Sequence, residues 1–249
     1  MCLIAWSWQP DSATPLLLIG NRDESYARPA QALHHWPDAP VLAGRDVQAG
    51  GTWLGVSHNG RLAALTNYRS AEPAHQDVPS RGGLVTDFLN SRLDAESYLQ
   101  ALQANADAYN PFNLLVYDGR KLLGLESRGA NIVRLQHGIG GVSNADFNTP
   151  WPKLRQLTAG LSCYVKDGRS DDAQLWPLLQ TRALADDAQL PNTGIPLTQE
   201  RALSATFVAT QGYGTRACSV VRMGRESVIF SEQRFGADGA LGVTVLSTG

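Results

Sequence analysis

Cysteine and histidine are scarce in this chain, and neither is spaced as in disulfide-rich or metal-binding proteins. The 249 residues include three cysteines, Cys2, Cys163 and Cys218, and no two of them have Cys-x-x-Cys spacing. An odd number without that spacing argues against a disulfide framework and against a zinc site. The five histidines show no metal spacing either. We therefore expect reduced thiols and no bound metal, with Cys163 and Cys218 filling buried positions.

Long apolar runs, charge of one sign and nucleotide-binding glycine motifs are also missing. No stretch approaches the roughly 20 apolar residues of a membrane span. The apolar segment 1–8 has no basic residue before it and no small-residue cleavage site after it, unlike a secretory peptide. The net charge is -2 without a basic stripe, and neither Gly-x-Gly-x-x-Gly nor a phosphate loop occurs. These absences predict a soluble, cytoplasmic protein with no membrane span and no nucleic-acid partner.

The composition is that of one folded domain with many tight turns. Hydrophobic residues make up 43% and charged residues 18%, and the 24 glycines and 13 prolines are spread along the chain. Strand-like segments come in groups, and helix-like segments come in pairs between the groups. This order predicts mainly antiparallel sheets in an α+β fold, rather than a doubly wound sheet. We interpret residues 1–249 as a single domain.

Residue patterns place the individual elements. The turn at 10–15 predicts a hairpin of the first two strands, and Asn59-Gly60 predicts another hairpin. Helical spacing predicts helices around 84–89 and 98–106, a third starting at Thr149-Pro150, and further helix at 172–188. The predicted strands are 3–8, 16–21, 41–43, 53–57, 62–67, 112–117, 122–126, 131–135, 139–143, 206–210, 217–223, 227–231 and 241–246.

Cys2 is the first candidate for chemistry, because it becomes the N-terminal residue if Met1 is removed. Aminopeptidases remove Met before a small residue, which would leave a thiol beside a free α-amine. In model compounds the thiol pKa is about 8.5 and the amine pKa about 7.7–8.0, so the amine can carry the thiol proton at neutral pH. The hypothesis is a nucleophile and its base in one residue. The alternative is a small buried residue that opens an edge strand.

A polar segment, Asn21-Arg22-Asp23-Glu24, directly follows the second predicted strand. Such a segment is usually a solvated turn, but antiparallel pairing of the first two strands brings Asp23 back to Cys2. Asp23 is then expected to orient the α-ammonium. Arg22 is expected to hold a substrate carboxylate or to favour the thiolate.

The same segment resembles the signature of the NRDE family, which is also called the transport and Golgi organization protein family. The resemblance spans nearly the whole chain, and several motifs make it more specific than one tetrapeptide. Further matching stretches are AGRD at 43–46, AGGTWLG at 49–55, LTNYR at 65–69, SRG at 80–82, NPFN at 110–113, GVSN at 141–144 and YGTR at 213–216.

The resemblance implies a fold similar to that of the N-terminal nucleophile hydrolases. That fold is an αββα four-layer sandwich of two mainly antiparallel sheets flanked by helices. It also implies a comparison with the cysteine amidases of that superfamily, such as bile-salt hydrolases and penicillin V acylases. On that comparison Cys2 matches the nucleophile, and Asp23 falls where the amine-orienting aspartate would lie. Arg22 differs, because those amidases carry an arginine at the position of Gly20, and its placement in or out of the pocket stays open.

The comparison assigns roles to three later residues. Asn67 and Asn144 resemble the two asparagines of the amidases, and we expect both to stabilise an oxyanion. Arg216 resembles their late arginine. Taken alone, each has a simpler reading: Asn67 as a turn residue, Asn144 as the start of the turn before Pro150, and Arg216 as a surface charge.

Further residues are expected to bind substrate. Trp53 follows a glycine-rich approach and is close in sequence to Tyr68 and Arg69, which is typical of a pocket wall. The full set of predicted substrate-binding residues is Asn21, Glu24, Trp53, Tyr68 and Arg69.

Two functions follow as hypotheses. The first is an amidase in which Cys2 attacks a small acyl substrate, forms a thioester and releases an amine. The second is a non-catalytic protein that binds and moves haem or an acyl thioester in the same cleft, since the family has been linked to haem or acyl-lipid handling. Haem, the one cofactor considered, would need Cys2 or a histidine as ligand, although His34-His35 is expected in a solvated loop. A purely structural interaction module is the third interpretation.

Overall fold

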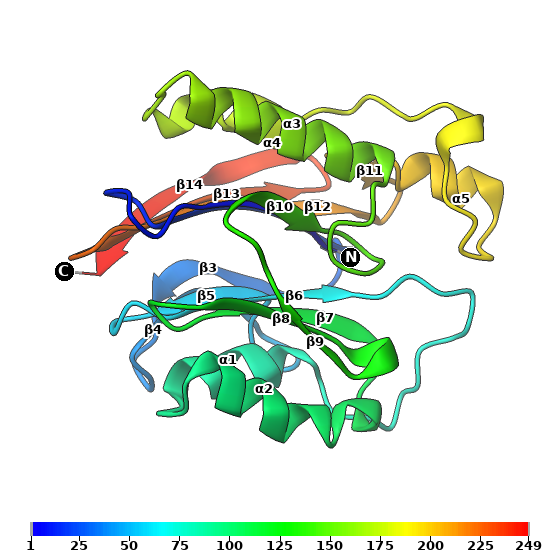
Figure 1. The fold of residues 1–249 in the computed structure, drawn as a ribbon. Helices are drawn as coiled ribbons and strands as arrows, with labels where there is room; N and C mark the ends of the chain where they lie inside the picture. Colours follow the sequence, from blue (N-terminus) through cyan, green and yellow to red (C-terminus); the bar gives the residue numbers. More distant parts are fainter. Residues whose placement is uncertain (1, 249) are drawn as a thin grey trace.

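Two antiparallel β-sheets form the centre of the molecule, and helices cover both outer faces (Figure 1). The computed structural model describes residues 2–248. In one sheet, called sheet A below, the strand order is β10-β1-β2-β12-β13-β14, and β11 pairs with β12. The strands of sheet A are β1 (Cys2–Trp8), β2 (Leu16–Ser25), β10 (Gly138–Val142), β11 (Ala209–Thr210), β12 (Tyr213–Met223), β13 (Val228–Gly236) and β14 (Gly239–Thr248).

The other sheet, sheet B, follows chain order from β3 to β9. Most neighbouring strands are joined by short connections, whereas β6 and β7 are joined by the segment 68–111, which contains two helices. Gly60 takes a φ of 73° in the predicted Asn59-Gly60 hairpin between β5 and β6. The strands of sheet B are β3 (Ala30–His35), β4 (Val41–Asp46), β5 (Leu54–Ser57), β6 (Leu62–Asn67), β7 (Phe112–Tyr117), β8 (Leu122–Glu126) and β9 (Asn131–Arg134).

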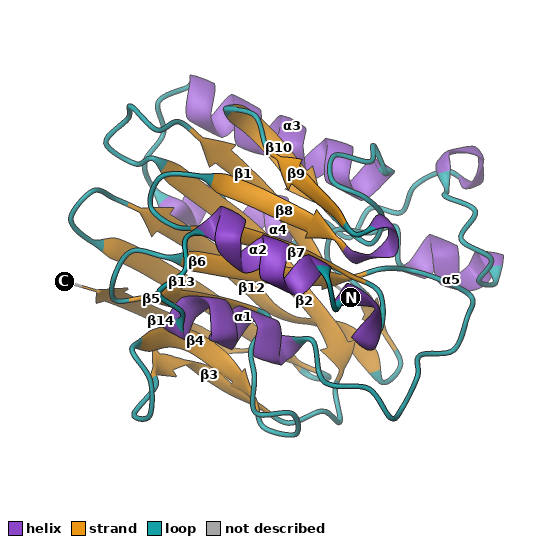
Figure 2. Ribbon diagram, turned by 60° about the horizontal axis from the view of Figure 1, so that its bottom comes forward, coloured by secondary structure: helices purple, strands orange, loops and turns teal. Residues whose placement is uncertain are grey.

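The helices form the two outer layers. Helices α1 (Gly82–Asn90) and α2 (Ala95–Gln103) lie across the outer face of sheet B (Figure 2), and α3 (Pro152–Lys166) and α4 (Trp176–Leu179) lie on sheet A. Helix α5 (Leu197–Ala202) stands at one end of the molecule (Figure 1). No helix within residues 2–248 combines the length and the hydropathy that crossing a membrane requires. Short 3₁₀ turns occur at Ala106–Ala108, Ser127–Gly129, Asp172–Gln174 and Asp187–Gln189.

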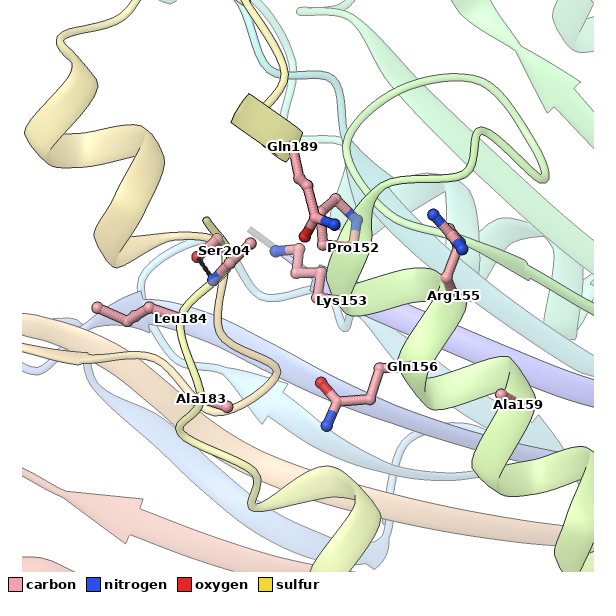
Figure 3. Close-up of a pocket in the computed structure, with 10 residues that line it drawn as sticks. Pro152, Lys153, Arg155, Gln156, Ala159, Ala183, Leu184, Gln189 and Ser204 are labelled. Carbon is pink, nitrogen blue, oxygen red and sulfur yellow. Dashed lines mark hydrogen bonds between the residues drawn. The ribbon is translucent and has the colours of Figure 1, made fainter. Parts of the chain in front are cut away.

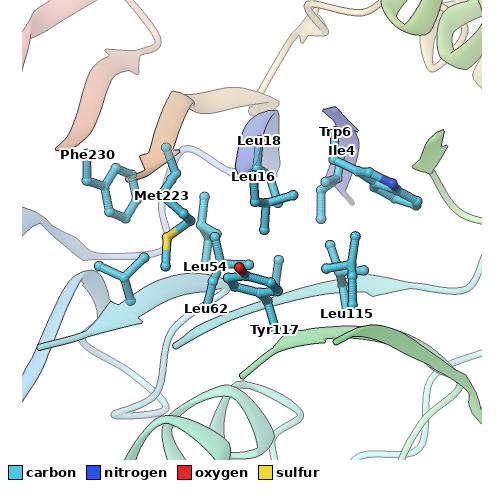
Figure 4. Close-up of a cluster of buried hydrophobic side chains, with 14 of the residues drawn as sticks. Ile4, Trp6, Leu16, Leu18, Leu54, Leu62, Leu115, Tyr117, Met223 and Phe230 are labelled. Carbon is cyan, nitrogen blue, oxygen red and sulfur yellow. The ribbon is translucent and has the colours of Figure 1, made fainter. Parts of the chain in front are cut away.

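Three apolar layers hold these elements together. The central layer fills the space between the sheets, and Leu18 and Leu62 meet there from opposite sides (Figure 4). Residues next to one another on β1 and β2 contribute to different layers, because successive strand side chains point to opposite faces. Ile4 and Leu18 face sheet B, whereas Leu3 and Ile19 face α3 and α4. Both faces of these strands are therefore covered, which explains their continuous apolar sequence.

The structure confirms the expected α+β architecture, with two antiparallel sheets flanked by helices. It also corrects three local expectations. His34 and His35 belong to β3, a half-exposed strand at the edge of sheet B, and not to a loop. The segment 172–188 is mostly irregular, with α4 as its one α-helix and a 3₁₀ turn at Asp172–Gln174. Helix α5 and strand β3 were not expected from the sequence pattern.

Candidate active site

Cys2 and Arg22 face each other across the first two strands. Cys2 begins β1, and the β1–β2 register pairs it with Arg22, so both side chains project from the same face of sheet A. Ile4, two residues further along β1, lies in the layer between the sheets, so this face is directed toward sheet B. The predicted hairpin of the first two strands is confirmed.

A cavity of about 120 Å³ opens at this position. Its walls come from both sheets and from the segment that enters α1. Six residues predicted for the site line it: Cys2, Arg22, Asp23, Glu24, Trp53 and Asn67. The remaining lining residues are Arg28, Asp46, Gly51, Thr52, Leu65, Ser80, Arg81 and Gly82.

Arg22 is directed into this cavity, which settles the placement that the sequence left open. Its guanidinium stacks over Trp53, 4.4 Å from the ring centroid, and its Nη2 donates to Asp46 Oδ2 at 3.1 Å. Its Nη1 is buried without a hydrogen-bond partner among residues 2–248. Gly20 and Arg22 are two residues apart on β2, so both positions lie on the same face of sheet A.

Asp23 projects from the other face of sheet A and is 1% exposed. Its Oδ1 accepts a hydrogen bond from Thr215 Oγ1 at 2.7 Å, and its backbone oxygen accepts one from the Tyr213 hydroxyl at 3.0 Å. The register places Asp23 one position beyond the Cys2–Arg22 pair, at the end where the chain begins. The predicted removal of Met1 concerns a residue outside the described range and stays a prediction.

Asn67 and Asn144 are in contact, but only Asn67 reaches the cavity. Asn67 ends β6, and Asn144 is a fully buried residue shortly after β10. Asn144 Nδ2 donates to the Asn67 backbone oxygen at 2.9 Å and approaches the Asn67 Oδ1 at 3.4 Å. Asn144 therefore contacts Asn67 from outside the cavity.

Arg216 and Asn21 lie beside the cavity but do not line it. Arg216 Nη1 donates to the carbonyl oxygens of Ser25, Tyr26 and Arg28, at 2.8, 3.3 and 3.0 Å, so its guanidinium fixes the end of β2. Asn21 alternates with Arg22 and projects to the other face. Two hydrogen bonds hold the side chain on that face, because Asn21 Nδ2 donates to the carbonyl oxygens of Leu179 and Thr206, both at 2.8 Å.

Tyr68 and Arg69 also lie outside the cavity, although they follow Asn67 directly. The ring of Tyr68 is covered by the guanidinium of Arg128 at 4.7 Å. Arg69 is buried, and its Nη1 donates to Glu200 Oε2 at 2.6 Å. The structure therefore gives both residues structural contacts and does not bring them to Cys2.

From the sequence alone, we did not identify three charged residues that line the cavity, namely Arg28, Asp46 and Arg81. Asp46 accepts hydrogen bonds from Arg28 Nε at 2.6 Å and from Arg22 Nη2 at 3.1 Å. Burial opposes ionisation of Asp46, but the Arg28 hydrogen bond prevails and lowers the Asp46 pKa. Arg81 donates from Nη1 to the carbonyl oxygen of Pro111 and is close enough to Cys2 for their charges to interact. The AGRD and SRG motifs that contain Asp46 and Arg81 were the available signal, but only the tertiary fold brings them to Cys2.

The cavity affects the Cys2 thiol in two opposing ways. Enclosure of the thiol raises its pKa above the ordinary value, and the charges of Asp23 and Glu24 add to this shift. Arg22 lowers the thiol pKa by favouring the thiolate. The net direction is upward, so the chain as described holds Cys2 as a thiol.

The other two cysteines differ from each other. Cys218 is buried on β12, as expected, and burial raises the pKa of its thiol well above the ordinary value. Cys163 is exposed on α3, so the expectation that it fills a buried position is wrong. Helical spacing places Cys163 on the outward face, because Tyr164 and Leu161 take the buried positions of that helix.

The fold resembles solved N-terminal amidases. A mutant of conjugated bile acid hydrolase from Clostridium perfringens superposes with a TM-score of 0.56, covering 99% of this chain and 92% of the hydrolase at 10% sequence identity. The N-acylethanolamine-hydrolyzing acid amidase orthologue from Caenorhabditis elegans superposes with a TM-score of 0.51, covering 90% of this chain and 93% of the amidase at 12% identity. At such low identity these likenesses establish the fold of the chain and nothing finer.

Sequence comparison identifies the family. The Transport and Golgi organization protein 2 homolog of Bos taurus is 37% identical, covering 94% of this chain and 92% of the relative. The homolog of Homo sapiens is 33% identical with the same two coverages, and the Drosophila melanogaster protein is 28% identical over 85% of this chain and 83% of the relative. The family described as Transport and Golgi organisation 2 matches residues 1–237. The chain belongs to the Transport and Golgi organisation 2 family, which confirms the resemblance noted in its motifs.

Proposed function

We propose that this protein is a cysteine N-terminal nucleophile hydrolase that cleaves the C–N amide bond of a small acyl substrate. The observation that carries the proposal is the position of Cys2 at the start of β1, in a cavity shared with Arg22 and Asn67. A fold of the N-terminal amidase type supports it. In the proposed active form Met1 has been removed, so that Cys2 carries a free α-amine.

The proposed reaction begins with proton transfer from the Cys2 thiol to its own α-amine. The thiolate attacks the substrate carbonyl carbon, and the carbonyl oxygen becomes an oxyanion. The C–N bond then breaks, the α-ammonium returns the proton to the departing amine, and a thioester remains on Cys2. Water, deprotonated by the same α-amine, attacks the thioester and releases the acid and the thiol.

Four neighbours have proposed roles in that sequence. Asn67 Nδ2 donates to the oxyanion, and Asn144 keeps Asn67 in the required orientation, as its 2.9 Å hydrogen bond indicates. Asp23 orients the α-ammonium from the adjacent register position. The positive charge of the α-ammonium, together with Arg22, offsets the upward shift of the thiol pKa that enclosure causes.

The size and charge of the cavity limit the proposed substrate. Its volume of about 120 Å³ suits a short acyl group. Pockets for drug-sized ligands usually measure about 300–1,000 Å³, so a haem macrocycle does not fit this cavity as it stands. Arg81 has no carboxylate partner among the described residues, so a substrate with a carboxylate close to the amide fits best.

The test has to separate Cys2 from the exposed Cys163. A Cys163→Ser background leaves Cys2 and the buried Cys218, and mass spectrometry then reports whether Met1 is absent. We expect iodoacetamide to label Cys2 at neutral pH and short N-acyl amides to be hydrolysed. Activity should disappear in Cys2→Ala and fall by about 10²–10³-fold in Asn67→Ala. Retention of Met1 in the purified protein, or amide turnover that survives Cys2→Ala, would contradict the proposal.

One observation favours a second function, namely the raised pKa of the Cys2 thiol, which disfavours an attacking thiolate. The alternative is a non-catalytic protein that binds and moves an acyl thioester or, in a widened form of the cavity, haem. Titration with a short acyl thioester and with haem distinguishes the cases. Binding of either ligand that persists in Cys2→Ala, without turnover of any amide, supports the alternative. A haem Soret shift abolished by Cys2→Ala supports haem ligation by the thiol.

A further inference from the structure

A larger cavity lies on the opposite side of sheet A from the space between the sheets. It measures about 470 Å³ and separates the first half of α3 from the segment around 183–189 (Figure 3). We call it the α3 groove. Its lining residues are Pro152, Lys153, Arg155, Gln156, Ala159, Ala183, Leu184, Ala185, Gln189 and Ser204.

Lys153 is the unusual member of this lining. It is 2% exposed, and its Nζ has no hydrogen-bond partner among residues 2–248. Figure 3 shows the side chain leaving α3 toward the space beside Gln189 and Ser204. Burial lowers the pKa of Lys153 to about 8, although the negative charges of Asp23 and Glu200 oppose this shift. An enclosed ammonium group without a hydrogen-bond acceptor is unfavourable even so. A ligand that supplies an acceptor in the groove would remove this penalty.

The rest of the groove has the same electrostatic preference. Arg155 adds a second cation, and no carboxylate occurs among the lining residues. Helix α3 begins at Pro152 without a side-chain cap and without an acidic residue in its first turn. Its positive dipole end and its first free N–H groups therefore add to the potential of Lys153. Asp186 and Asp187 lie on the facing segment but do not line the groove, and Asp187 forms an ion pair with Arg201.

We propose that the α3 groove binds a small anionic ligand, with a carboxylate or phosphate group at Lys153 Nζ. Apolar lining at Ala159, Ala183 and the exposed Leu184 would cover the uncharged part of that ligand. The groove shares no lining residue with the Cys2 cavity, although the charges of Asp23 and Cys2 act on Lys153 through sheet A. Binding of an anion at Lys153 Nζ does not require the reaction proposed at Cys2.

Two probes and one matched pair of variants test the site. Inorganic phosphate and octanoate are titrated by calorimetry into the wild type, Lys153→Met and Lys166→Met. Lys166 lies on the same helix, but it is exposed and outside the groove. Lys153→Met keeps the length of the side chain and removes the enclosed charge, so we expect it to fold and to melt at a higher temperature than the wild type.

We expect saturable binding of at least one probe to the wild type, to Lys166→Met and to Cys2→Ala. In Lys153→Met the affinity should fall by about tenfold or more. Octanoate alone would identify an aliphatic acid as the ligand class, and phosphate alone a phosphorylated compound; either result supports the site. Equal affinity of Lys153→Met and the wild type, or no saturable binding of either probe at millimolar concentration, would overturn it.

Discussion

Enclosed polar atoms without hydrogen-bond partners among residues 2–248 occur on both faces of sheet A. Arg22 Nη1 and Glu232 Oε2 lie on the side toward sheet B, and Lys153 Nζ lies on the side toward α3. Each lowers the stability of the folded state, because an enclosed polar group loses its hydration.

Glu232 offers a test of this stability penalty. It is 1% exposed, and its Oε1 accepts a hydrogen bond from the backbone N–H of Leu33 at 2.8 Å. Burial raises the pKa of Glu232 to about 7, although the Leu33 hydrogen bond and the charges of Arg234 and Arg22 oppose this shift. The folded state therefore holds a proton that the unfolded state loses above its ordinary value of 4.5. Stability should fall as pH rises through this window, and the penalty should be complete above about pH 7.

Glu232→Gln keeps the acceptor for Leu33 and removes the charge. We expect the variant to match the wild type below pH 4.5 and to exceed it by up to roughly 3 kcal/mol above pH 7. Urea unfolding across this range measures the difference. An advantage that does not change with pH would show that folding does not raise the pKa of Glu232.

At this scale the local pattern predicted the residues that one hairpin brings together, and the motifs around Trp53 and Asn67 added two residues that also line the cavity. Cys2 and Asp23 are neighbours because β1 and β2 pair, and that pairing can be read from a turn between two apolar runs. Asp46 and Arg81 come from sheet B and from the start of α1. Their approach to Cys2 depends on how the sheets face each other, which no local pattern specifies. The same reason explains why Tyr68 and Arg69 were wrongly expected close to Asn67's cavity.

At the scale of elements, the entry of α1 shapes the cavity. Ser80, Arg81 and Gly82 lie at the start of this helix and line the cavity beside Gly51. The two glycines pack so closely that a Cβ on Gly51 would lie 2.5 Å from the carbonyl carbon of Gly82. The absence of side chains at both positions therefore sets the position of Arg81.

Gly51→Ala tests this contact. The added methyl group meets backbone, which cannot rotate away, so we expect a loss of about 1–3 kcal/mol and a displaced α1. Displacement of Arg81 removes a charge that favours the thiolate, so iodoacetamide should label Cys2 more slowly in a Cys163→Ser background.

Gly83→Ala is the matched control, because a Cβ on Gly83 would meet only Asp87 Oδ2, at 4.0 Å. It should leave labelling unchanged and add up to about 1 kcal/mol of stability. Equal behaviour of the two variants would refute the role of the close contact.

Elements with a strong periodic pattern were predictable, and weakly patterned ones were not. Helix α2 begins after Asp94, whose side chain accepts from the backbone N–H of Ser97 at 2.8 Å, as its sequence indicates. Strand β3 has only Leu33 fully buried, because it lies at the edge of sheet B, so no alternation marks it. Helix α5 buries mainly Glu200, which forms an ion pair with Arg69 in place of an apolar contact. Tertiary contacts, not local propensity, specify these two elements.

At the scale of the whole molecule, the central apolar layer joins two halves that each carry their own helical layer. Sheet B with α1 and α2 buries Phe88 in one outer layer, and sheet A with α3 buries Leu161 in the other. Residues of β1 and β2 serve both the central layer and the α3 side. Loss of either outer layer therefore exposes surface that the central layer depends on, and the expected single domain should unfold as one unit.

This expectation can be tested with substitutions in opposite outer layers. Phe88→Ala should lower the free energy of unfolding by about 3–5 kcal/mol and Leu161→Ala by about 2–5 kcal/mol. In urea, each variant should show one transition whose midpoint is the same by tryptophan fluorescence and by far-UV circular dichroism, because both layers unfold together.

Leu241→Ala, at a side chain that is 55% exposed on β14, is the control and should change stability by less than about 0.5 kcal/mol. If each variant instead shifted only one of two separate transitions, the two halves would be independent folding units. The Cys2 cavity, whose walls come from both sheets, would then exist only while both halves are folded and docked.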